Sequence, residues 1–115
     1  MELKQIRAVP VADVNQEGVK GVKVQVLLGE QDRAPSHTMR LFFLEAGGHT
    51  PQHSHPYEHE IIVHEGSGIL LAAGEEHPLE EGVVALVEPG EEHQFCAGPK
   101  GMTFFCMVPH VGHKV

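Results

Sequence analysis

Two histidines separated by one residue, His53 and His55, are the feature of this sequence with the clearest chemical meaning. Residues two apart on a β-strand point to the same side, so two imidazoles at this spacing can bind one metal ion without rearranging the backbone. A third ligand from the next strand and a fourth from a distant one would complete the site. Imidazole nitrogens suit zinc, copper, iron, nickel and manganese. Such a pair also occurs among solvent-exposed loop histidines, so the surrounding residues decide its meaning.

The surrounding residues favour a metal site. His59 and Glu60 follow His55 at four and five residues, and a strand-like apolar run comes next. Farther along, a proline-glycine turn precedes another histidine, His93. His59, Glu60 and His93 could therefore supply the further ligands that a metal site built on His53 and His55 needs.

Together these segments resemble the two signature motifs of the cupin superfamily. The resemblance is closest to small single-domain cupins of the monocupin or cupin 2 conserved barrel type, which bind a metal through four histidines. It implies an all-β fold, a double-stranded β-helix or jelly-roll barrel of short antiparallel strands. The first motif comprises Gly47, His53, His55, His59 or Glu60, and Gly66, and the second comprises Pro89, Gly90 and His93. Ala97 stands where the second motif often has asparagine, but no ligand is lost by this difference.

The resemblance implies that the metal ligands are His53, His55, His59 and His93, with Glu60 as the alternative to His59. Neighbouring residues of a strand point to opposite faces, so only one of His59 and Glu60 can easily reach the ion. His59 shares its face with Ile61 and Val63, which is the better interior face. The cofactor is expected to be one divalent transition metal ion: Mn, Fe, Cu, Ni, Co or Zn.

The pocket around the ion is expected to be mostly apolar, with few groups for acid-base chemistry. An arginine turned inward could hold a carboxylate or an enolate. Arg40 could instead point outward at the surface, and Tyr57 could contribute packing alone. The candidate pocket residues are Arg40, Phe42, Tyr57, Phe95, Phe104 and Cys106.

The elements that position these residues are expected to be short strands, because 13 glycines and 8 prolines punctuate the chain. Gly47-Gly48 is expected to end the second strand and Gly66-Ser67-Gly68 the third, so that the third and fourth strands form a hairpin. Many short strands with turns between them predict a β-sandwich or barrel. The expected strands cover residues 22–28, 39–44, 59–64, 69–73, 83–87, 93–96 and 102–108, with one edge strand before Asn15.

Length and composition predict a single domain over residues 1–115, with N-terminal edge strands over about 1–30 and the barrel over about 38–109. The net charge of −8 argues against a nucleic-acid partner. No apolar run is long enough to span a membrane, and residues 1–7 lack the apolar region of a signal peptide, so a cytoplasmic protein is expected. Cys96 and Cys106 are expected to be free thiols in adjacent strands. The remaining loop and tail histidines, His37, His49, His77, His110 and His113, are expected to be solvated.

Three functions are compatible with such a site. The first is a dioxygenase-like oxidoreductase acting on a small organic molecule at a redox-active ion. The second is an isomerase or lyase in which the ion acts as a Lewis acid. The third is a non-catalytic module that binds a small molecule. A homodimer is expected in each case, because exposed edge strands need cover.

Overall fold

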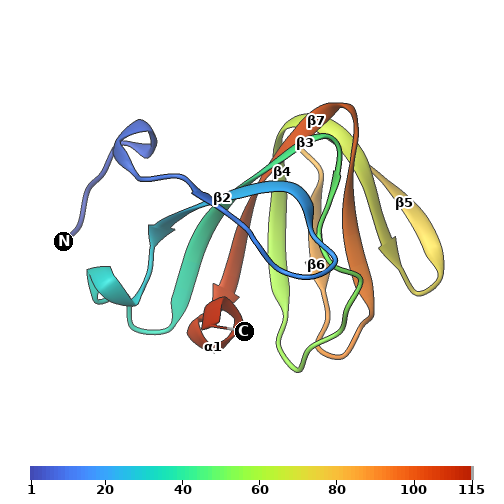
Figure 1. Ribbon diagram of the computed structural model, residues 1–115. Helices are drawn as coiled ribbons and strands as arrows, with labels where there is room; N and C mark the ends of the chain where they lie inside the picture. Colours follow the sequence, from blue (N-terminus) through green and yellow to red (C-terminus); the bar gives the residue numbers. More distant parts are fainter. Residues whose placement is uncertain (115) are drawn as a thin grey trace.

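The chain folds as an antiparallel sheet of seven strands in a computed structural model that describes residues 1–114 (Figure 1). The order is β1-β2-β3-β7-β4-β5, and β6 pairs with β4. This confirms the all-β antiparallel expectation, including an edge strand before Asn15. The strands are β1 (Ala12–Asp13), β2 (Lys20–Leu28), β3 (His37–His49), β4 (His59–Ala72), β5 (Glu75–Glu80), β6 (Val84–Val87) and β7 (His93–Pro109). The helical segments are η1 (Ile6–Ala8), η2 (Glu30–Asp32) and α1 (His110–Lys114).

The hairpin predicted at Gly66-Ser67-Gly68 is wrong, because β4 runs through these residues without a break. The true hairpin joins β4 to β5 through Ala73 and Gly74, which both have positive φ, as a two-residue turn requires. The glycines in β4 serve a different purpose: a Cβ atom at Gly66 or Gly68 would collide with the backbone of β7. They allow β4 and β7 to approach closely where the register shifts.

Two other predicted breaks are also wrong. Gly47-Gly48 does not end its strand, since β3 continues to His49. The segments 93–96 and 102–108 belong to one strand, β7, so Cys96 and Cys106 lie on the same strand rather than on adjacent ones. Strand β5 was not predicted, because its sequence is polar and contains Pro78. It is an edge strand paired only with β4, a position that tolerates proline.

The core lies between the long strands β3, β4 and β7. Its fully buried side chains include Val63, Val87, Phe104 and Val108. Strand β7 pairs with β3 along one edge and with β4 along the other. The register of these three strands therefore determines which of their side chains face the interior. No helix in residues 1–114 has the length and apolar character needed to cross a membrane.

The two ends of the chain are tied to this framework. The buried Gln25 on β2 donates hydrogen bonds from Nε2 to the carbonyls of Ile6 and Val9, both at 2.9 Å. Helix α1 follows β7 directly (Figure 1), and its first residue, His110, lies 2.8 Å from Thr38 Oγ1 through Nδ1. Its Nε2 donates to the carbonyl of Ala34 at 2.7 Å. His110 is therefore a structural residue and not the solvated one that its place near the end of the chain suggested.

Candidate metal centre

Three histidines converge at one end of the barrel. Each of His53, His55 and His93 brings a ring nitrogen within 4.8 Å of the other two. His53 and His55 lie in the segment between β3 and β4, so their convergence does not come from a shared strand face, as the spacing suggested. A short antiparallel bridge brings them to β7 instead: His53 N–H donates to the carbonyl of His93 at 3.1 Å and His93 N–H donates back at 2.9 Å.

Hydrogen bonds to backbone carbonyls fix two of these rings. Nδ1 of His55 donates to the carbonyl of Tyr57 at 2.8 Å, and Nδ1 of His93 donates to the carbonyl of Glu91 at 2.8 Å. A carbonyl only accepts, so the proton of each neutral ring is on Nδ1 and the lone pair is on Nε2. In metal sites, hydrogen bonds of this kind from Nδ1 orient the imidazoles so that Nε2 faces the ion.

His59 joins the cluster from the first position of β4. Its Nε2 lies 2.7 Å from Nε2 of His55, and its ring centroid lies 5.3 Å from that of His93. Two ligands about 2.1 Å from one ion and at right angles to it are roughly 3 Å apart, so this separation suits neighbouring ligands. Glu60 is exposed, on the opposite face of β4. The strand parity that favoured His59 over Glu60 thus agrees with where the two side chains point.

The environment keeps these imidazoles neutral. Burial lowers the pKa of His53, His55 and His59 below the ordinary value of 6.5, and for His59 the pKa falls to about 2. Neighbouring imidazoles add to the effect, because a proton on one ring is repelled by a charge on the next. Neutral imidazole is the form that binds a metal, so the donor set fits a divalent transition ion.

A cavity of about 210 Å³ opens beside the cluster, and His53, His59 and His93 form part of its wall. The six candidate pocket residues all lie on this wall: Arg40, Phe42, Tyr57, Phe95, Phe104 and Cys106. They come from β3, β7 and the segment before β4, which the sheet order places side by side.

Cys106 connects the histidine cluster to Arg40. Its sulfur lies 3.1 Å from Nδ1 of His59, and Nη2 of Arg40 donates to the same sulfur at 3.4 Å. Burial raises the pKa of the Cys106 thiol above its usual value. Both cysteines are free thiols, as the sequence predicted.

Tyr57 supports the cluster from the other side. Its ring stacks on that of His55, with centroids 3.9 Å apart and planes 7° from parallel. The ring is buried. Gly112 of α1 packs so closely against it that a Cβ atom at position 112 would collide with the ring. Burial also raises the pKa of the Tyr57 hydroxyl.

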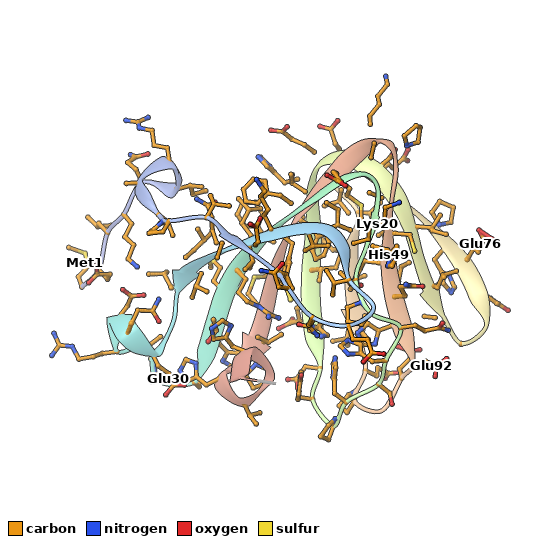
Figure 2. The ribbon with its side chains drawn as sticks, in the orientation of Figure 1. Met1, Lys20, Glu30, His49, Glu76 and Glu92 are labelled. Atoms are coloured by element: carbon orange, nitrogen blue, oxygen red, sulfur yellow. The ribbon has the colours of Figure 1, made fainter. Side chains whose placement is uncertain are left out.

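Part of the cavity wall was not predicted from the sequence. His113 lines the cavity from α1, although it was expected to be solvated. Val14, Gln16 and Val19, from the segment between β1 and β2, line it as well. No local pattern marks these residues, because long-range packing of both ends of the chain brings them to the site. His49 lies outside this wall, beside Lys20 of β2 (Figure 2), where its Nδ1 contacts the side chain of Gln94.

Comparison with known proteins agrees with this geometry. The Cupin_2 family, described as a cupin domain, matches residues 40–108. The chain belongs to this family, and its fold is the double-stranded β-helix barrel that the motifs implied. No curated protein matches the chain.

Solved structures match over nearly the whole chain. The polyketide cyclase RemF from Streptomyces resistomycificus is 29% identical, with a TM-score of 0.91 over 96% of this chain and 80% of its own. A predicted oxalate decarboxylase from Thermotoga maritima is 23% identical, with a TM-score of 0.83 over 94% of this chain and 98% of its own. A sugar phosphate isomerase of the cupin superfamily from Silicibacter pomeroyi is 21% identical, with a TM-score of 0.82 over 94% of this chain and 75% of its own. The last two comparisons concern the fold alone.

Proposed function

We propose that this protein is a metal-dependent enzyme in which an ion held by His53, His55, His59 and His93 polarises an oxygen atom of a small organic substrate. The observation that carries the proposal is the convergence of the imidazoles of His53, His55 and His93. In His55 and His93 Nδ1 is bound to a backbone carbonyl, which leaves Nε2 for the ion. Four neutral ligands leave the full charge of the ion in place, which favours its action as a Lewis acid. The similarity to a polyketide cyclase supports chemistry at a carbonyl or enol oxygen.

The chain's own residues would supply binding and orientation rather than acid-base catalysis. Tyr57 and Cys106 hold His55 and His59 in place through stacking and a contact to Nδ1. Phe42, Phe95 and Phe104 form an apolar wall that excludes water from the substrate.

A dioxygenase-like oxidoreductase is the second candidate, since imidazole ligands accept iron, manganese and copper as readily as zinc. The position of Cys106 favours the Lewis-acid reaction, because a thiol 3.1 Å from a ligand nitrogen is exposed to oxidation where oxygen is activated. Activity with zinc alone would support the Lewis-acid reaction, whereas substrate-dependent oxygen consumption that requires a redox-active ion would support the oxidoreductase. A barrel that binds a small molecule without reaction would show neither.

The first experiment is elemental analysis of protein without a His tag, stripped of metal and reloaded with Zn²⁺. We expect about one equivalent per chain in the wild type, a loss in His55→Ala and His59→Ala, and no change in Glu60→Gln. His64→Ala is the matched control, because His64 lies on β4 with its side chain 51% exposed. Retention of metal in His59→Ala together with its loss in Glu60→Gln would make Glu60 the ligand. No metal in the wild type would contradict the proposal.

The expected homodimer and the cytoplasmic location stay predictions. Light scattering of the purified protein tests the first, and cell fractionation tests the second.

A further inference from the structure

Arg40 is a buried cation on the wall of the cavity. It lies on β3 directly opposite Cys106 of β7, and only 9% of its surface is exposed. Its position on this wall places its charge beside the proposed metal centre, because Cys106 contacts both Arg40 and His59.

The groups that contact Arg40 are neutral. Nη2 donates to the thiol of Cys106 at 3.4 Å, and Cζ lies 4.8 Å from the centre of the Phe42 ring. Its Nε atom is buried without a hydrogen-bond partner. Across residues 1–113, whose side chains the structure describes, no carboxylate forms an ion pair with this guanidinium. A guanidinium with five donors, held out of water among neutral groups, is stabilised when an anion binds to it.

The cavity also carries no negative charge of its own. The chain has 16 acidic residues and a net charge of −8, yet none of the described residues that line the cavity is Asp or Glu. Among the side chains of residues 1–113, the wall holds one permanent cation, four histidines and otherwise uncharged groups. The permanent charge on this wall is therefore opposite in sign to the net charge of the molecule, and a metal ion on neutral imidazoles would add to it.

Aromatic rings define the shape of the ligand. Phe104 stacks with Phe42 at 5.3 Å and with Phe95 at 4.7 Å, so the three rings form one continuous row along the cavity wall. Arg40 lies at the Phe42 end of this row and His93, 6.0 Å from Phe95, lies at the other end. An apolar body that packs along these rings can reach Arg40 with one end and His93 with the other.

We propose that the ligand of this cavity is a small organic carboxylate, whose carboxylate pairs with Arg40 and whose apolar body packs on Phe42, Phe104 and Phe95. This names the substrate class of the proposed function and rests on it, since the other end of the ligand would meet the metal centre. The small volume of the cavity, about 210 Å³, limits the ligand to one ring or a short chain.

Calorimetric titration of the zinc-loaded protein tests the proposal, with benzoate as the probe and benzamide as its neutral counterpart of the same shape. We expect the wild type to bind benzoate at least about tenfold more tightly than benzamide, as a charge-assisted contact requires. Arg40→Gln should remove this preference, and Arg40→Lys should retain part of it. Arg7→Gln, which changes an exposed arginine in η1, should behave as the wild type.

The zinc content and melting temperature of every sample are measured alongside, so that folding and metal loading are known for each variant. Equal binding of the two probes by the wild type, no binding of benzoate, or a preference that survives in Arg40→Gln would overturn the proposal. In the last case the carboxylate binds the metal alone. If the wild type takes up no zinc but still shows a benzoate preference that depends on Arg40, the anion site is supported and the proposed metal centre is contradicted.

Discussion

At the scale of single residues, Arg40 is a buried cation that forms no ion pair among residues 1–113. It is buried against a thiol and an aromatic ring, with Nε unpartnered. The sequence leaves the direction of Arg40 open between an inward and an outward position, because Arg40 sits in a strand of apolar residues and its direction depends on strand register. Pairing of Arg40 with Cys106 sets that direction, and pairing is a property of two strands.

Replacing this arginine should therefore stabilise the free protein. We expect Arg40→Met to raise the free energy of unfolding by about 1 to 2 kcal/mol, because an uncompensated buried charge is exchanged for an apolar side chain of similar length. Urea denaturation of the metal-free protein measures the change. Arg7→Met is the control and should change stability by less than about 0.5 kcal/mol. A destabilised Arg40→Met would mean that the guanidinium has a stronger partner than the thiol.

Tyr57 contributes to the site through its ring. The ring lies flat on His55 at 3.9 Å and packs against Gly112. We expect Tyr57→Ala to cost about 3 kcal/mol of stability and to weaken zinc binding by at least about tenfold, because His55 loses the surface that orients it. Tyr57→Phe keeps the stack and should keep both properties. Weak zinc binding in Tyr57→Phe would instead assign the role to the hydroxyl group.

At the scale of elements, the long strands β4 and β7 depend on glycines that allow close approach. The sequence marks Gly66 and Gly68 as special positions, but it does not distinguish a turn from a close approach of two strands, since both need glycine. A glycine in a turn and a glycine at a close approach of two strands differ only in which atoms occupy the place that a Cβ atom would take. For Gly68 this is the carbonyl of Cys96, which belongs to a strand far along the chain.

Gly68→Ala should therefore be more harmful than substitution of a glycine that needs only its backbone conformation. We expect a cost of about 3 kcal/mol, because the new Cβ atom forces β4 and β7 apart. Gly47→Ala is the comparison: Gly47 has φ of 71° and open space around it, so its cost should be about 1 kcal/mol. Thermal unfolding of both variants measures the difference. Equal losses of stability would show that β7 shifts to accommodate the additional Cβ atom.

At the scale of the whole molecule, the cavity combines parts that the sequence predicts with parts that it does not. The candidate metal-binding histidines and the aromatic wall follow from motifs and strand parity, which are local. Val14, Val19 and His113 reach the cavity only because the segment before β2 and helix α1 pack beside it. Their positions in the cavity wall depend on long-range contacts. One of them is the contact between His110 and Thr38, which lie 72 positions apart in the sequence.

Because His55 and His59 come from a loop and from β4, while His93 belongs to β7, an ion bound by all of them would link separate parts of the barrel. We expect zinc at 100 times its dissociation constant to add about 2.7 kcal/mol to the free energy of unfolding, since the unfolded chain lacks the assembled site. Chelation should reverse the effect. The gain should vanish in His59→Ala and persist in His64→Ala, whose ring lies on the outer face, 5.3 Å from Phe105. Denaturation curves that are the same with and without zinc would show that the histidines of the barrel do not assemble a metal site.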